Sequence, residues 1–245
     1  MNLRPAKIIN SEFPVLEVKN FLSKKQSTKI IEELSSNKEF DVHDIHNRRM
    51  LVKGSRHFNE FIRKSSISSK LFKIMNSKSF FSRVIKLFKM NFNHNFFKVE
   101  NNLTSFSKNL FTKHLQKKLT KSKSKDKVYF DIDFSIAGKN YYRGPHRDKP
   151  NRFFVFLIYL NKVKKNSGGC LEILKPKKKS FKKKRLINKD FYKKIITPSA
   201  GKMVIFLANE NSYHAASRFK SNKDKRYFIY GSYSMNKNVN WRLNK

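Results

Sequence analysis

The sequence predicts an α+β protein in which a strand-rich C-terminal half forms a sandwich of antiparallel strands and the N-terminal half adds helices. Residues 128–136 alternate apolar and polar side chains, which is typical of a strand with one buried face. Residues 152–160 form an apolar run of the kind found in strands buried on both faces. Apolar side chains at helical spacing over residues 66–89 predict two helices that pack on a sheet.

The 245 residues are expected to divide into an annex and a core within one compact unit. Residues 1–125 are predicted to form a strand and helices that pack on a core made by residues 126–245. Ser23 followed by Gln26 is a capping box that opens a helix. Apolar spacing over residues 103–118 predicts a further helix.

The C-terminal half contains three more predicted strands, each introduced by turn-forming residues. They are Cys170–Leu174, which follows Ser167-Gly168-Gly169; residues 202–208, which follow Pro198-Ser-Ala-Gly201; and residues 226–233. Asp131 and Asp133 lie on the polar face of the strand over 128–136, and we expect them to pair with neighbouring lysines.

A candidate metal site is indicated by the pattern His146-Arg147-Asp148. Side chains at positions i and i+2 of an extended strand point to the same face, so His146 and Asp148 can reach one ion. His214 follows an apolar strand and a short polar turn, which predicts a position at a strand end. Two imidazoles and one carboxylate form the facial triad that holds non-haem Fe(II) with coordination positions left open.

The order of these pieces resembles the prolyl-4-hydroxylase-like branch of the 2-oxoglutarate/Fe(II)-dependent dioxygenases. The resemblance covers roughly residues 127–235, and its matching stretches are residues 142–148, 158–161, 167–172, 200–206, 213–214 and 226–227. It implies a double-stranded β-helix (jelly-roll) core with flanking N-terminal helices. Strand patterns alone would not separate that fold from other sandwiches.

The same resemblance implies a hydroxylase that uses Fe(II), 2-oxoglutarate and O2, with ascorbate as a candidate auxiliary cofactor. It implies His146, Asp148 and His214 as iron ligands, and Arg226 as the partner of the distal carboxylate of 2-oxoglutarate. Arg218 is a rival because the gap from His214 to Arg226 is longer than in some relatives. Arg226 is preferred because it opens the final apolar strand.

Tyr159 is the second residue that the resemblance places near the cosubstrate, with its hydroxyl against the same carboxylate. Core packing on a buried strand explains this tyrosine equally well. The resemblance does not name the substrate, and peptidyl proline, a free amino acid, a sugar and a small metabolite all stay open.

The formal net charge of +39 has two readings. Such a field attracts polyanions, but the lysines are spread along the whole chain, which favours compositional drift. Residues 175–185 are a denser basic cluster, predicted to be an exposed loop that draws an acidic substrate towards the site. Nucleic acid is not favoured as a substrate, because Ser232 stands where alkylation-repair relatives carry a second arginine. The alternative function is a non-catalytic jelly-roll module that binds nucleic acid or an anionic glycan.

Composition also predicts the compartment. The single cysteine, Cys170, excludes an internal disulfide framework. No stretch approaches the roughly 20 apolar residues of a membrane span, and the first residues lack a hydrophobic signal core. We therefore expect a cytoplasmic protein without a membrane span, whose oligomeric state the sequence leaves open.

Overall fold

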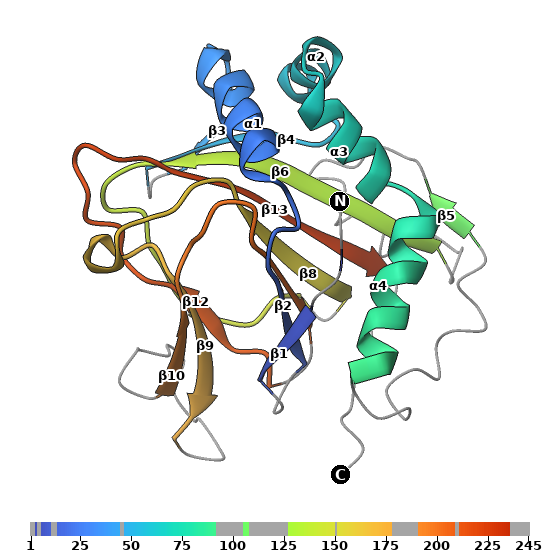
Figure 1. Cartoon of the computed structure of the whole chain (residues 1–245), viewed down its shortest axis with the longest axis vertical. Coiled ribbons are helices and arrows are strands. Elements are labelled where there is room, and N and C mark those ends of the chain that lie inside the picture. Colours follow the sequence, from blue (N-terminus) through green and yellow to red (C-terminus); the bar gives the residue numbers. More distant parts are fainter. Residues whose placement is uncertain are drawn as a thin grey trace.

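The computed structural model describes residues 3, 6–10, 14–44, 47–91, 105–107, 127–149, 151–177, 191–208 and 211–235. Its strands form a larger and a smaller sheet, and its helices lie on the side of the larger sheet that faces away from the smaller one (Figure 1). None of the helices in these ranges is long and apolar enough to cross a membrane.

The larger sheet has the order β1-β2-β11-β8-β13-β6-β4-β3, with β5 beside β6. All neighbours are antiparallel except the pair β5 and β6. Its strands are β1 (Ala6–Asn10), β2 (Val15–Val18), β3 (Val42–Asp44), β4 (Arg48–Val52), β5 (Ser105–Ser107), β6 (Lys127–Ala137), β8 (Arg152–Tyr159), β11 (Met203–Leu207) and β13 (Arg226–Met235).

The smaller sheet has the antiparallel order β10-β9-β12-β7. Its strands are β7 (Arg143–His146), β9 (Leu171–Pro176), β10 (Phe191–Ile196) and β12 (His214–Ala216). From β6 onward the chain crosses repeatedly between the two sheets, as in a jelly roll. The predicted α+β jelly roll is therefore confirmed.

Strand β8 shows why the sequence of a central strand can be a continuous apolar run. All eight of its residues are buried, because the larger sheet has a core on each face. Alternate residues serve the two cores: Phe154, Phe156 and Ile158 pack towards the helices, whereas Val155, Leu157 and Tyr159 pack between the sheets. The second core surrounds the pocket described below.

The helices are α1 (Lys24–Ser36), α2 (Arg56–Lys64), α3 (Ile67–Met75) and α4 (Lys78–Asn91), with a short 3-10 turn, η3 (Lys165–Ser167). The predicted capping box is confirmed, since the Ser23 hydroxyl accepts from Gln26 N at 3.1 Å and Gln26 Oε1 accepts from Ser23 N at 2.9 Å. The two helices predicted within residues 66–89 are also confirmed. Helix α2 was not predicted.

One further expectation is partly wrong, and two others are not tested by the structure. The helix predicted over residues 103–118 is wrong at residues 105–107, where β5 pairs with β6, and the rest lies outside the described residues. Backbone pairing with a long neighbouring strand outweighs the local helical spacing there. Most of the basic cluster, residues 178–185, also lies outside the described residues. The division at residue 125 stays a prediction, although β1 to β5 all join the sheet of the C-terminal strands.

The carboxylate of Glu33 on α1 caps the first turn of α3. It accepts hydrogen bonds from the backbone N–H groups of Ser66 at 2.9 Å, Ile67 at 3.1 Å and Ser68 at 3.1 Å, and from the Ser68 hydroxyl at 2.6 Å. Burial acts to raise the pKa of Glu33, but these hydrogen bonds outweigh it and the pKa lies below its ordinary value.

We expect Glu33→Gln to lower the free energy of unfolding by about 1 kcal/mol near neutral pH, because an amide caps the helix less well than a carboxylate. A folded-state pKa below the unfolded one stabilises the protein above the unfolded value of 4.5, and this stabilisation is lost as pH falls through the folded pKa. Urea unfolding at neutral and acidic pH measures both effects. Glu32→Gln, on the same helix in an exposed pair with Lys29, is the control and should change stability by a few tenths of a kcal/mol.

Candidate metal centre

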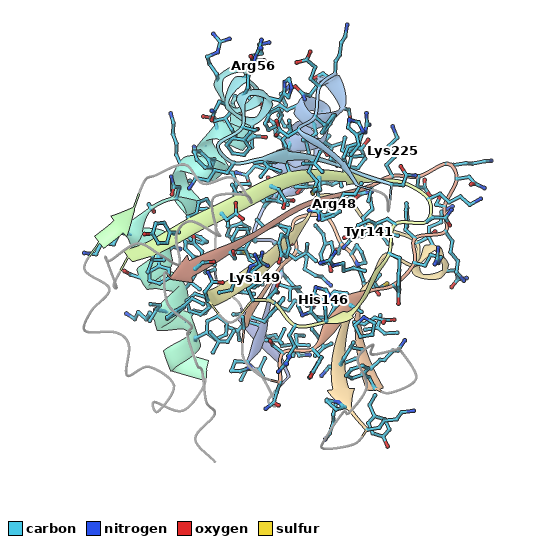
Figure 2. All side chains as sticks on the ribbon, turned by 180° about the vertical axis from the view of Figure 1, so that it is seen from behind. Arg48, Arg56, Tyr141, His146, Lys149 and Lys225 are labelled. Carbon is cyan, nitrogen blue, oxygen red and sulfur yellow. The ribbon has the colours of Figure 1, made fainter. Side chains whose placement is uncertain are left out.

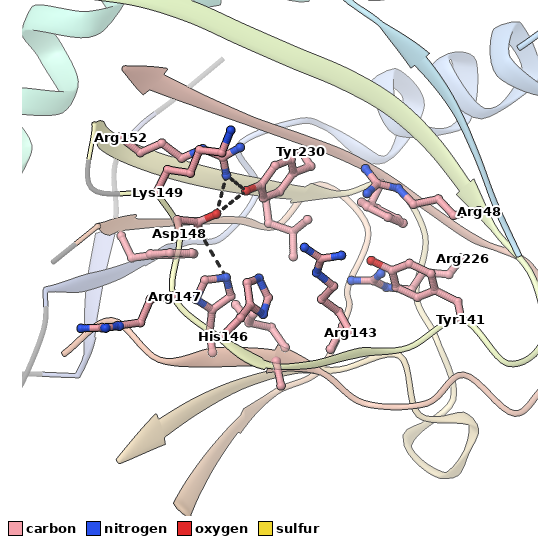
Figure 3. A pocket seen from close by; sticks show the side chains of 17 residues that line it. Arg48, Tyr141, Arg143, His146, Arg147, Asp148, Lys149, Arg152, Arg226 and Tyr230 are labelled. Atoms are coloured by element: carbon pink, nitrogen blue, oxygen red, sulfur yellow. Dashed lines mark hydrogen bonds and ion pairs between the residues drawn. The ribbon is translucent and has the colours of Figure 1, made fainter. Parts of the chain in front are cut away.

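Strands β7 and β12 bring the two histidines of the predicted triad together. His146 and His214 are paired in register, and their ring centroids lie 4.3 Å apart. Asp148 completes the cluster, and potential ligand atoms of the three residues all lie within 4.8 Å of one another. Asp148 lies beyond the end of β7, so the expected position on a common strand face is wrong for this residue. The chain turns after His146 and still directs the carboxylate to the imidazoles (Figure 3).

Both imidazoles are held by backbone carbonyl groups two residues earlier. His146 Nδ1 lies 2.8 Å from Gly144 O, and His214 Nδ1 lies 2.9 Å from Ser212 O. A carbonyl oxygen only accepts, so each Nδ1 carries a proton, and in the neutral ring each Nε2 then has a lone pair for a ligand. Burial, and then the neighbouring His214, lower the pKa of His146 to about 4, which keeps this ring neutral near pH 7.

The two oxygens of Asp148 have different surroundings. Oδ1 accepts from the Tyr230 hydroxyl at 2.9 Å and from the Arg152 guanidinium. Oδ2 is buried, has no hydrogen-bond partner among the described residues, and lies 3.4 Å from His214 Nε2. Burial acts to raise the pKa of Asp148, but Arg152 above all outweighs it and the pKa lies below its ordinary value.

Two imidazole nitrogens and one ionised carboxylate oxygen therefore face one point, where they can act as ligands. This donor set fits a divalent transition metal, and three protein ligands leave room for others. A second group of potential ligands in the described ranges, Glu39, His57 and Glu60, is more exposed. Glu60 in that group is already paired with Arg56 at 2.9 Å, so the group is a poorer candidate.

A cavity of about 350 Å³ extends from this cluster to Arg226, the first residue of β13. Arg226 is only 1% exposed, and its guanidinium lies 4.2 Å from the ring centroid of Phe228 and 5.2 Å from that of Tyr141. Its Nε and Nη1 are buried and make no hydrogen bond within the described part of the chain. Leaving such donors unpaired is costly, which indicates an anionic ligand at this end of the cavity.

Tyr159 lies beside Arg226, whose guanidinium is 5.5 Å from the tyrosine ring centroid. The Tyr159 hydroxyl is buried and has no hydrogen-bond partner among the described residues. Burial raises the pKa of Tyr159, although Arg226 acts in the opposite direction, so the phenol stays neutral and can donate. The ring packs in the core between the sheets, and Tyr159 is not one of the residues that line the cavity, so its role towards 2-oxoglutarate stays a prediction.

The rival arginine has different surroundings. Arg218 is exposed, is not one of the residues lining the cavity, and lies with its guanidinium 5.4 Å from the ring centroid of Tyr142. Figure 2 shows Arg48, Tyr141 and His146 within the body of the molecule, whereas Arg56 and Lys225 lie at its periphery.

Several residues of the pocket were not found from the sequence. Tyr230 and Phe228 share the face of β13 with Arg226, so the period of two along this strand was a usable signal. No pattern in the sequence around Arg152 predicted its ion pair with Asp148. The expectation that Asp133 pairs with a lysine is wrong, because Asp133 pairs with Arg48 from β4, the neighbouring strand.

Many protein families share this fold. The segment that contains the three potential metal ligands and Arg226 indicates which of them this chain is similar to. Residues 132–233 match the sequence profile of the 2OG-Fe(II) oxygenase superfamily. Over this segment the chain is similar to the 2OG-Fe(II) oxygenases. The predicted resemblance is confirmed, and the match supports an enzyme of the dioxygenase class. Curated protein sequences give no match to the chain.

Solved structures of oxygenases of this class are similar to this chain in fold. A prolyl-4-hydroxylase from Pseudomonas putida superposes with a TM-score of 0.51 at 11% identity, over 90% of this chain and 92% of the other. A 2OG-Fe(II) oxygenase family oxidoreductase from Burkholderia pseudomallei gives 0.51 at 12% identity, over 93% and 87%. At 11% and 12% identity, the structural similarity shows a shared fold and no more than that.

Proposed function

We propose that this protein is an Fe(II)- and 2-oxoglutarate-dependent hydroxylase with His146, Asp148 and His214 as iron ligands. Arg226 and Tyr159 bind the distal carboxylate of 2-oxoglutarate. One observation carries the proposal: the cavity has an unpaired buried acceptor atom, Asp148 Oδ2, beside the two histidines and the unpaired buried donors of Arg226 at its other end. A cation and a dicarboxylate that spans the cavity satisfy both ends.

Each residue has a separate task in this proposal. When bound, Fe(II) supplies the site at which O2 is activated as 2-oxoglutarate is converted to succinate and CO2. Arg152 and Tyr230 hold Asp148 Oδ1, which leaves Oδ2 directed at the histidines. Arg226 fixes the far end of the cosubstrate, and the apolar walls of the cavity, including Phe206, limit the access of water.

Binding of 2-oxoglutarate to protein loaded with Mn(II), a redox-inert substitute for Fe(II), tests the proposal without a known substrate. Calorimetry is expected to show binding to the metal-loaded protein and at least about 10-fold weaker binding to the metal-free protein, because the metal holds one end of the molecule. Equal affinities in the two states would contradict it. Metal-independent, salt-sensitive binding of DNA or heparin would favour the non-catalytic module instead, which neither the sequence match nor the fold supports.

A glycine beneath Arg226 gives a further test. Gly169 has a φ of +68°, and a Cβ at this position would lie 3.0 Å from Arg226 Cδ. We expect Gly169→Ala to displace the guanidinium and weaken 2-oxoglutarate binding about 10-fold, with Mn(II) affinity changed little. The strained backbone also lowers stability by about 1 kcal/mol. Calorimetry with each ligand separates the two effects, and equal losses of metal and 2-oxoglutarate affinity would contradict the assignment.

A further inference from the structure

We propose that the substrate of this site carries an oxyanion, a carboxylate or a phosphate group, which Arg143 binds beside the metal centre. The inference rests on the proposed function and adds to it the chemical class of the substrate. It is carried by the charges that line the cavity and by the position of one arginine among them.

Among the charged side chains that line the cavity, Asp148 is the acid and six are cations: Arg48, Arg143, Arg147, Lys149, Arg152 and Arg226. Two of the cations have carboxylate partners: Arg48 pairs with Asp133, and Arg152 pairs with Asp148. Arg226 is assigned to the cosubstrate by its burial and by the unpaired Tyr159 hydroxyl beside it. Arg147 lies over the ring of Tyr213 at 4.9 Å and is exposed.

Arg143 is the arginine of the cavity wall that has no such assignment. It is the first residue of β7, the strand that ends at His146, and its side chain points into the cavity (Figure 3). Its backbone pairs with Ala216 of β12, but its side chain makes no hydrogen bond, ion pair or ring contact with any other residue that the structure describes. The side chain is exposed, whereas Arg226 is buried, so Arg143 is open to a molecule entering from solvent.

The charges of the loaded site do not neutralise Arg143. A divalent metal and a dianionic cosubstrate cancel in charge, and the pairs Asp148–Arg152 and Asp133–Arg48 each cancel as well. Arg143, Arg147, Lys149 and Arg226 remain in excess, in a cleft whose low-dielectric walls strengthen the field of like charges. A guanidinium group matches the geometry of carboxylates and phosphates. An anionic substrate is therefore favoured over a neutral or cationic one.

The test uses the full chain loaded with Mn(II) and saturated with 2-oxoglutarate, so that Arg226 is already occupied. Calorimetry then measures the binding of acetate, inorganic phosphate and, as a neutral probe of similar shape to acetate, acetamide. The variants are Arg143→Gln, Arg143→Lys and the control Arg218→Gln, whose arginine is exposed and outside the cavity.

We expect at least one anion to bind the wild type more tightly than acetamide does. Arg143→Gln should weaken that binding about 10-fold, Arg143→Lys should restore part of it, and Arg218→Gln should leave it unchanged. Preference for acetate points to a carboxylate substrate, and preference for phosphate points to a phosphorylated one. The affinity for 2-oxoglutarate in Arg143→Gln should stay within about two-fold of the wild type.

Several results would overturn the inference. They are the absence of anion binding, anion affinity that Arg143→Gln leaves unchanged, and loss of 2-oxoglutarate affinity in that variant, which would assign Arg143 to the cosubstrate. These outcomes leave the proposed function standing as long as the wild type binds 2-oxoglutarate. If the metal-loaded wild type does not bind 2-oxoglutarate, the proposed function fails and this inference fails with it.

Discussion

Asp148→Ala is expected to weaken metal binding by more than about 100-fold and to abolish succinate formation from 2-oxoglutarate. The substitution removes the anionic ligand, while two neutral imidazoles bind a divalent cation less tightly. It also leaves Arg152 buried without its carboxylate partner, which destabilises the fold by about 3 kcal/mol or more. Titration with Mn(II) and a succinate assay with Fe(II) measure the two functional losses.

A second variant separates loss of the ligand from loss of the fold. Asp148→Asn keeps the shape of the side chain and one acceptor for Tyr230 and Arg152, so we expect it to fold while it still loses most of its metal affinity. Circular dichroism verifies the fold of each variant. A folded Asp148→Asn protein that forms succinate at the wild-type rate would contradict the assignment of Asp148 as an iron ligand.

Arg226→Ala is expected to weaken 2-oxoglutarate binding by about 100-fold, because it removes two charge-assisted hydrogen bonds to the distal carboxylate. Mn(II) affinity should change little, since Arg226 is not among the potential metal ligands. Calorimetry of the metal-loaded protein measures both quantities.

Arg218→Ala is the matched control for this prediction, since both arginines follow His214 in the sequence. Arg218 is exposed and outside the cavity, so its loss should leave 2-oxoglutarate affinity unchanged. If Arg218→Ala lost 2-oxoglutarate affinity and Arg226→Ala kept it, the cosubstrate arginine would be Arg218 instead.

The parts of the fold that were predicted correctly are those with strong local patterns. Strand β6 alternates because its apolar face meets the helices, but the expectation of one buried face is wrong, since Tyr129, Asp133 and Ser135 on its other face are buried as well. Strand β8 is continuously apolar because a core covers each face. The capping box at Ser23 involves residues three apart in sequence, so its signal is also local. The grouping of His146 with Asp148 was predictable for the same reason, and the family resemblance then indicated His214.

The parts that were missed depend on contacts between residues far apart in sequence. Tyr230 holds Asp148 across the space between the sheets, and Gly169 lies beneath Arg226. Neither contact has a local signature. Strand β5 lies within residues 103–118, whose apolar spacing fits a helix, yet its backbone pairs with β6. The carboxylate of Glu33 caps α3 from another helix, and no pattern within α3 predicts this.

The most direct test of the central claim is the anaerobic addition of Fe(II) and 2-oxoglutarate to metal-free protein, followed by visible spectroscopy. The proposed site predicts a metal-to-ligand charge-transfer band that requires both additions. The band should be absent in Asp148→Ala and weakened in Arg226→Ala. Folded wild-type protein that shows no band under these conditions would contradict the proposed oxygenase and favour the non-catalytic binding module.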